Sequence, residues 1–362
     1  MHFFPRPETG SFASVLVRSS ALLAMAVVLS FPGSASASTL SLGQASQFGV
    51  FILGNFVGSG TDSQGPMAVG GNFAPSTGGF AIASQWSDPA GKFDLVVGGN
   101  LTNSGNSLGG GDVFVGGNMA WTDPTVPHDV YVNGVYSDPG NGGSVGGTVY
   151  WYGANLTGNT FANQQVANPT ASPVDFAAAQ ANLDAVSTAL AAQTANGTTQ
   201  FDGYYTYTLT GGSTGINVFN LSASSYIGDT INITAPLGST VIVNVSGTSD
   251  SFNGGSLILN GVTASNVIFN FANATSVSLA SYAFNGTVLA PLANFSGNGG
   301  QIDGQLIAAS AQGTTEFHND IFSGDLPASN TSATPEVPNW IMMLSGIGMV
   351  VIARRRAPSR KG

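Results

Sequence analysis

Few residues of this chain can do chemistry, and the most suggestive group is Glu316, His318 and Asp320. Alternate residues of a β-strand point to the same face, so these three side chains could converge on a metal ion. Such a trio is more often an exposed polar strand, and whether it holds a metal stays unknown at the level of sequence. The pair His128-Asp129 is the second candidate. A catalytic serine would need a histidine and an orienting acid, and neighbourhood in sequence does not reveal that arrangement.

Carboxylates are the other chemical resource, because a glycoside hydrolase needs two of them about 5 to 10 Å apart. The candidate aspartates are Asp112, Asp123, Asp129 and Asp138. Nothing in their spacing fixes such a separation. A polysaccharide lyase would also need cations to neutralise a uronate substrate, and Lys92 alone cannot supply them. We therefore predict that the protein is not an enzyme, and a carbohydrate-active β-helix hydrolase remains an alternative.

Charge is distributed very unevenly along the chain. Lys92 is the only lysine or arginine between residues 38 and 333, a stretch that holds 16 acidic residues and a net charge of −15. Repulsion excludes nucleic acid and anionic membrane surfaces as partners. The absence of cysteine excludes thiol catalysis and thiolate metal sites. We expect no cofactor, with structural Ca²⁺ as an open hypothesis, because Gly109-Gly-Gly-Asp112 resembles half of a glycine-rich calcium repeat without its nonapeptide period.

A repeated tetrapeptide indicates which elements would position these residues. Val-Gly-Gly-Asn occurs at 69–72, 97–100 and 115–118, each time after a short apolar run, and 145–148 reads as a degraded fourth copy. Glycine allows backbone angles that other residues resist, and asparagine hydrogen-bonds readily at a corner. Strand-then-corner units of this kind predict a mainly β fold, a parallel β-helix or solenoid. A β-sandwich with hairpin turns is the alternative.

Short strands are also predicted in the C-terminal half, because apolar residues alternate there with Asn, Ser or Thr. The predicted strands are 231–234, 241–245, 256–260, 266–271, 276–279, 286–289 and 301–307.

A single segment, about 173–195, has the pattern of an α-helix. Ser172 is the expected N-cap, and Pro173 suits the first turn. The apolar residues at helical spacing are Phe176, Leu183, Val186 and Leu190. This stripe predicts a long helix packed alongside the solenoid, with the stripe in the core and not in a cofactor site.

The N-terminus has the layout of a secretory signal. Arg6 and Arg18 give a positively charged start, 21–31 is apolar, and Ala35-Ser36-Ala37 is a cleavage site of the A-x-A type. Residues 1–37 are therefore predicted to be a signal peptide.

The C-terminus has an apolar segment, 340–353, flanked by prolines and arginines. As a helix it spans only about 21 Å, against a hydrocarbon core of about 30 Å, so a transient stop in the inner membrane is favoured over a permanent anchor. The arginines should stay on the cytoplasmic side.

This tail resembles the PEP-CTERM sorting signal, which an exosortase recognises and cleaves in bacteria that have an outer membrane and make exopolysaccharide. The residues that carry the resemblance are Pro335, Glu336, Val337, Pro338, Trp340, Arg354, Arg355 and Arg356. The usual order is Val-Pro-Glu-Pro, so Pro-Glu-Val-Pro is a permuted variant. The resemblance implies a sorting tail at 335–362 after a linker at 327–334, an exosortase as a partner, and a secreted or cell-surface location reached through the inner membrane.

The region 38–326 resembles the choice-of-anchor A domain. The resemblance begins with 42–56 and 65–72, and it continues through the helix to about Asp325. It implies an adhesive, β-helical domain of surface or secreted proteins that carry one of several alternative sorting tails, and it brings no catalytic residues. Strands with one long lateral helix, together with 287–291 and 303–308, also resemble ice-binding β-solenoids in architecture.

These features predict an exported surface or biofilm-matrix protein, a non-catalytic adhesin that binds exopolysaccharide or the glycans of neighbouring cells. Flat faces of small polar residues would make many weak contacts, and aromatic side chains could stack on sugar rings. The candidate stacking residues are Tyr150, Trp151, Tyr152, Tyr204, Tyr205 and Tyr207. The alternatives are the β-helix hydrolase and an ice-binding solenoid.

Overall fold

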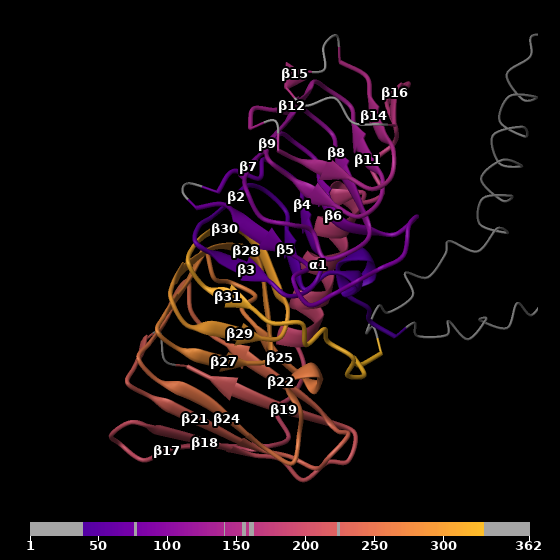
Figure 1. The fold of residues 1–362 in the computed structure, drawn as a ribbon. Helices are drawn as coiled ribbons and strands as arrows, with labels where there is room; N and C mark the ends of the chain where they lie inside the picture. The colour runs from indigo at the N-terminus through magenta and orange to yellow at the C-terminus, as the bar shows by residue number, and fades with distance from the viewer. Residues whose placement is uncertain are drawn as a thin grey trace, which may run out of the picture. The chain divides into compact units, whose positions relative to one another are not determined.

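Short strands and tight corners alternate through most of the structured chain (Figure 1). The computed structural model describes residues 39–328, apart from 76–77, 141, 154–156, 159–162 and 223–224. The predicted signal peptide, the sorting tail and most of the predicted linker lie outside the described residues. Each turn of the chain passes along three faces in succession, which gives a three-faced solenoid. We call them the helix face, the polar face and the third face.

The helix face is a continuous parallel sheet of twelve strands. In spatial order its strands are β16 (Gln164–Val166), β14 (Val149–Trp151), β11 (Val130–Val132), β8 (Asp112–Val115), β6 (Phe93–Val97), β4 (Met67–Val69), β1 (Val50–Ile52), β30 (Leu306–Gly313), β28 (Thr287–Asn298), β25 (Val267–Asn270), β22 (Thr240–Val245) and β19 (Ile216–Leu221).

The polar face follows after the next corner of each turn. β28 and β30 are long enough to bend across that corner, so their C-terminal halves belong to this face. Its other strands are β15 (Thr157–Gly158), β12 (Tyr136–Asp138), β9 (Met119–Thr122), β7 (Leu101–Ser104), β2 (Phe56–Gly58), β26 (Ser276–Ala280), β23 (Ser249–Asn253) and β20 (Ser225–Ile227).

The third face completes each turn. Its strands are β13 (Ser144–Val145), β10 (Thr125–Val126), β5 (Phe80–Ile82), β3 (Thr61–Ser63), β31 (Glu316–Phe317), β29 (Gln301–Asp303), β27 (Ala283–Asn285), β24 (Ser256–Asn260), β21 (Thr230–Thr234), β18 (Thr206–Thr210) and β17 (Thr198–Phe201). Among the named strands of the described chain, only β17 and β18 pair antiparallel. The predicted parallel β-solenoid is therefore confirmed, and the sandwich alternative is wrong.

The chain does not run through the solenoid from one end to the other. β1 lies between β4 and β30, with Val50 opposite both Met67 and Leu306, so the first coil of the domain pairs with its last. From this central coil the N-terminal wing (67–166) extends to one end. The C-terminal wing (198–317) begins at the opposite end and coils back to the centre, as Figure 1 shows.

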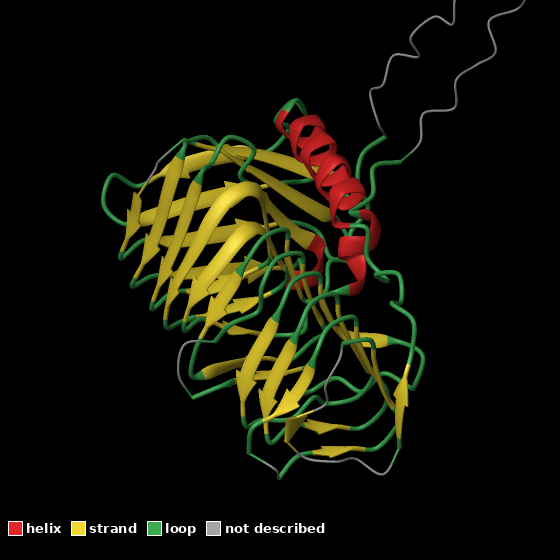
Figure 2. Ribbon diagram, turned by 90° about the horizontal axis from the view of Figure 1, so that it is seen from above, coloured by secondary structure: helices red, strands yellow, loops and turns green. Residues whose placement is uncertain are grey.

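The helix α1 (Phe176–Ala191) makes the return between the two wings and lies along the stack of strands (Figure 2). The predicted stripe is confirmed, since Leu183, Val186 and Leu190 are buried against the helix face. The predicted start is wrong: the N-cap is Asp175, whose carboxylate accepts a hydrogen bond from Ala178 N at 3.0 Å, and Ser172 bonds to Val174 ahead of the helix.

Two buried asparagines hold α1 in place on the sheet. Asn270 donates to the carbonyl of Ser187 and to Asn244 Oδ1, both at 2.9 Å, and it accepts from Ser187 Oγ at 2.6 Å. Asn244 donates to the carbonyl of Leu190 at 2.9 Å. Because these buried groups satisfy one another, they fix the position of the helix without an unpaired polar atom among them.

The Gly-Gly-Asn corners form a ladder between the helix face and the polar face. The side-chain oxygen of Asn72 accepts from the backbone N of Asn100, and that of Asn100 accepts from Asn118 N, both at 2.8 Å. Glycine is required because successive corners touch: a Cβ on Gly98 would lie 2.4 Å from the carbonyl oxygen of Gly70. The repeat was correctly interpreted as a set of solenoid corners.

The proposed fourth copy at 145–148 is wrong. Val145 belongs to β13 on the third face, so its glycines turn a different corner. The fourth corner of the ladder is instead formed by Gly134 and Val135. The backbone N of Val135 donates to Asn118 Oδ1 at 2.9 Å. An asparagine at the preceding corner, and not the local tetrapeptide, defines the register.

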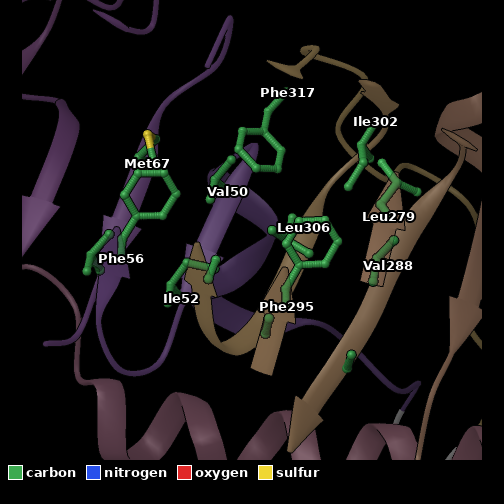
Figure 3. Packing of buried hydrophobic residues seen from close by; sticks show 14 of the residues in the cluster. Val50, Ile52, Phe56, Met67, Leu279, Val288, Phe295, Ile302, Leu306 and Phe317 are labelled. Atoms are coloured by element: carbon green, nitrogen blue, oxygen red, sulfur yellow. The ribbon is translucent and has the colours of Figure 1, made fainter. Parts of the chain in front are cut away.

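The core runs through the inside of both wings and is continuous where they meet. Figure 3 shows Val50 and Ile52 of β1 beside Leu306 of β30 and Val288 of β28, all of them fully or almost fully buried. The predicted strand 301–307 is in fact two strands, β29 and the start of β30, because the chain turns a corner at Gly304 and the buried Gln305. Of the helices in the described part of the chain, none has the length and apolarity to cross a membrane.

Candidate ligand-binding face

Three columns of small polar side chains stand on the polar face of the C-terminal wing. They arise because β23, β26 and the second halves of β28 and β30 pair in register, with every second residue pointing outward. We call these residues the polar columns: Ser249, Ser276, Asn294 and Ser310; Ser251, Ser278, Ser296 and Gln312; Asn253, Ala280 and Asn298.

The columns form a two-dimensional array of hydroxyl and amide groups. Neighbouring strands of a sheet are about 4.8 Å apart, and outward residues of one strand recur at about 6.7 Å. Ser276 Oγ donates to Ser249 Oγ at 2.8 Å, and Ser310 Oγ donates to Asn294 Oδ1 at 2.6 Å, so some side chains are held in position along a column. Such an array can exchange hydrogen bonds with a ligand that repeats at a matching spacing.

No charged side chain of these strands points outward. Their one acid, Asp250, is 1% exposed and faces the interior, and burial raises its pKa to about 6. Val57 of β2, which is 40% exposed, lies next to Gln312 at one end of the central column. Ile227 of β20, which is 63% exposed, lies next to Asn253 at the opposite end of the third column. The face is therefore uncharged in a domain that is strongly acidic as a whole.

The four candidate catalytic aspartates accept hydrogen bonds from backbone amides. Asp112 accepts from the backbone N of Gly91 and of Asp129, and Asp129 accepts from Thr148 N at 2.7 Å. Asp138 accepts from Asp123 N at 2.8 Å, and Asp123 accepts from Gly142 N at 2.5 Å. Carboxylates occupied by turn amides are structural, and this arrangement does not supply the free acid–base pair of a hydrolase.

The candidate histidine groups assemble only in part. His318 Nε2 lies 3.2 Å from Glu316 Oε1, but the second partner of the ring is Asp303, through Nδ1, and Asp320 does not join them. The carbonyl of His128 accepts from Gly147 N, and the carboxylate of Asp129 accepts from Thr148 N and from the Tyr131 hydroxyl. Within the described residues, no group of three or more histidine or acidic side chains has the geometry to hold a metal ion.

The two aromatic clusters lie at opposite ends of the solenoid, so they do not form one site (Figure 1). At the β14 end, Tyr150 stacks on Tyr131 with ring centroids 4.9 Å apart, Trp151 packs against the core, and Tyr152 is 54% exposed. These positions leave Tyr152 as the most accessible of the three.

At the β18 end, Tyr204 and Tyr205 are 78% and 63% exposed. Asp202 Oδ1 accepts from both of their backbone amides, at 2.8 and 3.0 Å, and these bonds lower the pKa of the carboxyl. Tyr207 stacks on Phe201 with ring centroids 4.4 Å apart and packs against the core. Sugar stacking by these residues stays a prediction.

The polar columns themselves were not singled out from the sequence. The signal was present, since Ser249–Asn253, Ser276–Ala280 and Asn294–Asn298 share a polar residue at alternate positions. It was hidden because Asp250 and Gly297 interrupt the apolar alternation, which left two of the three strands unpredicted.

Comparison with known proteins places the chain in a family. Over residues 41–319 the chain matches the family described as "Putative Ice-binding-like adhesive domain", and it belongs to that family. The match supports the adhesive class implied by the choice-of-anchor A resemblance, and an adhesive domain implies a surface or extracellular location. None of the curated proteins compared with the chain is significantly similar to it.

Three solved structures align over most of the chain at low identity. An ice-binding protein of the Antarctic ascomycete Antarctomyces psychrotrophicus is 14% identical, over 81% of this chain and 100% of its own, with a TM-score of 0.29. An ice-binding protein from an Antarctic biological consortium is 15% identical, over 80% and 93%, with a TM-score of 0.29. The ice-binding protein 1 domain of Shewanella frigidimarina is 15% identical, over 80% and 98%, with a TM-score of 0.30.

Proposed function

We propose that this protein is a non-catalytic adhesin whose polar columns bind a repetitive polar ligand, the exopolysaccharide of a biofilm matrix or the glycans of a neighbouring cell. The observation that carries the proposal is the uncharged, in-register array of hydroxyl and amide groups over β23, β26, β28 and β30. Many weak contacts in register favour a polymer over a single small molecule. Strongly acidic surfaces elsewhere disfavour nucleic acid as a partner.

A pair of arginines placed in the central column tests this proposal. Ser251→Arg with Ser278→Arg introduces two long charged side chains on adjacent strands of the polar face. The matched control is Thr234→Arg with Asn260→Arg, which are exposed and adjacent in register on the third face. Binding to immobilised exopolysaccharide should be lost in the first variant and kept in the control, with the melting temperature of both close to that of the native chain.

Ice is the second candidate ligand. The observation that favours it is the regular, uncharged arrangement of the polar columns, which contain Ser, Ala, Asn and Gln only and stand on strands paired in register. The structurally similar proteins named above are described as ice-binding, whereas the family of this chain is described as ice-binding-like and adhesive. Thermal hysteresis that disappears in the Ser251→Arg, Ser278→Arg variant would assign the face to ice.

Export is the remaining part of the proposal. The sequence supports removal of residues 1–37 by signal peptidase, a transient stop in the inner membrane through 340–353, and cleavage by an exosortase just before or within 335–338. Intact-mass measurement of the protein recovered outside the cell tests this directly. A mature chain from Ser38 to the 335–338 region is expected, and a chain that retains Arg354–Arg356 would contradict the sorting role.

A further inference from the structure

A pocket of about 420 Å³ lies outside the polar face, where four separate segments of the chain meet. Its walls come from the 3₁₀-helix η1 (Gly43–Gln47), the loop between β5 and β6, residues 173–174 ahead of α1, and Ile321 near the C-terminal end of the domain. The volume falls in the range of about 300 to 1,000 Å³ that is typical of small-molecule sites. A pocket of this kind suits one compact ligand and not a polymer lying flat.

The lining combines aromatic walls with a polar rim. Phe48, Trp86 and Phe93 supply aromatic surface, and Asp88, Lys92 and Gln47 supply polar groups. Lys92 is the one lysine or arginine among the described residues, and it is found at this pocket and not on the polar face. Its Nζ lies 3.8 Å from Asp88 Oδ1, and the Lys92 and Asp88 side chains are 66% and 22% exposed, so the ammonium is open to a ligand and the carboxylate is partly open.

The walls are held in place before any ligand arrives. Gln44 bridges η1 to the segment ahead of α1, donating to the Pro173 carbonyl at 3.4 Å and accepting from Asp175 N at 3.0 Å. The loop is fixed from the other side, because Gly91 N donates to Asp112 Oδ2 and Asp112 N donates to the Lys92 carbonyl. A preorganised pocket binds without an additional ordering cost.

The chemistry of the lining selects the ligand. Asp88 and Lys92 together carry no net charge, which argues against a strong anion or cation, and the polar rim argues against a purely apolar molecule. A carboxylate acceptor beside an ammonium donor matches two neighbouring hydroxyl groups, and an aromatic wall matches the C–H face of a sugar ring. We propose that this pocket binds a single neutral pyranose, either free or at the end of a glycan chain. The site is separate from the polar columns and does not depend on them.

The test is titration of the full chain with four neutral sugars, and binding is measured by calorimetry and by tryptophan fluorescence. The sugars are methyl glucopyranoside, methyl galactopyranoside, methyl mannopyranoside and N-acetylglucosamine. Glucuronate and cyclohexanol serve as an anionic and an apolar comparison, and a short neutral oligosaccharide distinguishes a chain end from a free sugar. Lys92→Met and Gln47→Ala each remove one polar group from exposed positions, so the fold should be kept. Gln180→Ala on the exposed side of α1 is the control matched to Gln47→Ala, because Gln180 belongs neither to the pocket nor to the polar columns.

At least one neutral pyranoside should bind saturably, with affinity about 10-fold weaker in Lys92→Met and in Gln47→Ala and unchanged in Gln180→Ala. Trp86→Phe should remove the fluorescence change while calorimetric binding persists. The proposal is overturned if no neutral pyranoside binds, if binding is unaffected by Lys92→Met and Gln47→Ala, or if glucuronate or cyclohexanol binds more tightly. Loss of polymer binding by the polar columns would leave these results unchanged, so the two proposals fail separately.

Discussion

The two wings of the solenoid use polar residues in different ways. In the N-terminal wing, Asn72, Asn100, Asn118 and the turn aspartates accept hydrogen bonds from backbone amides at the corners. In the C-terminal wing the strands are longer, and Ser, Asn and Gln stand on the outer face in register. The N-terminal wing uses these side chains to close its own turns, and the C-terminal wing presents its polar columns to solvent. This difference is the reason why we propose a ligand-binding face in the C-terminal wing.

The largest effect is expected where corners touch in the N-terminal wing. Gly98→Ala would place a Cβ 2.4 Å from the Gly70 carbonyl oxygen, so the backbone of two coils must move apart. We expect a loss of about 3 kcal/mol in the free energy of unfolding, measured by chemical denaturation. The control is Gly212→Ala, where nothing lies within 4 Å and the change should stay within about 0.5 kcal/mol. Equal effects at the two positions would show that the corner contacts do not limit the residue type.

The next effect concerns the helix that joins the wings. Asn270→Ala removes the partner of Ser187 and Asn244 in a buried network, so we expect a loss of about 2 kcal/mol in the free energy of unfolding. Asn220 is in register with Asn244 but is exposed, so Asn220→Ala should cost far less. A loss as large for Asn220→Ala would mean that α1 is not positioned by the buried pair.

A buried carboxyl in each wing predicts a pH dependence. Burial raises the pKa of Asp94 to about 7 and that of Asp250 to about 6, well above the ordinary carboxyl value. Folding therefore favours the protonated acids, and the stability they confer is complete below about pH 4 and is lost as the pH rises through 6 to 7. The melting temperature should fall between pH 4.5 and 7.5.

Substitution separates the two carboxyls. Asp250→Asn should flatten the pH dependence below about pH 6, and Asp94→Asn should flatten it up to about pH 7. Each group contributes a slope of at most about 1.4 kcal/mol per pH unit. A melting temperature that rises over this range in the native chain would contradict the burial of these acids.

A smaller effect compares one asparagine from each wing. Asn100→Ala deletes the acceptor of Asn118 N at a corner and should cost about 1 kcal/mol in stability while exopolysaccharide binding persists. Asn253→Ala on the polar columns should leave stability unchanged and weaken binding. If Asn100→Ala weakened binding and Asn253→Ala lowered stability, the proposed division of roles between the wings would be wrong.

No effect is expected from removal of divalent cations. The aspartates considered for calcium, including Asp112, already accept hydrogen bonds from backbone amides. Dialysis against a chelator should leave the melting temperature of the protein unchanged. A drop that calcium restores would show that these turns hold a cation.

Local patterns in the sequence predicted the elements better than their arrangement. The Gly-Gly-Asn corners and the apolar stripe of α1 follow from backbone geometry and helical spacing, so they could be recognised before the structure was known. The pairing of Val50 with Leu306 could not be recognised in this way, because every coil has the same local pattern and that pattern does not indicate which coil lies next to it. The start of α1 was misplaced because Ser172 and Asp175 are both good N-caps, and packing decides between them.

The sequence predicted the type of candidate site but not its position. Alternation with Ser and Asn indicated flat polar faces, but the choice of one face depends on which residues share a column, and that requires the register of β23, β26 and β28. The aromatic candidates illustrate the same limit, since Tyr207 and Trp151 pack against the core while Tyr204 and Tyr205 are exposed. Residue type suggests a role, and burial, set by long-range packing, determines whether a side chain is accessible.

The most direct test of the central claim measures binding and polymer length together. The purified full chain is incubated with the exopolysaccharide of the organism that makes it, with and without Ca²⁺, and the polymer is then sized by chromatography. The account predicts saturable binding with no shortening of the polymer, and loss of that binding in the Ser251→Arg, Ser278→Arg variant. Shortening of the polymer, or equal binding by the native chain and the variant, would contradict it.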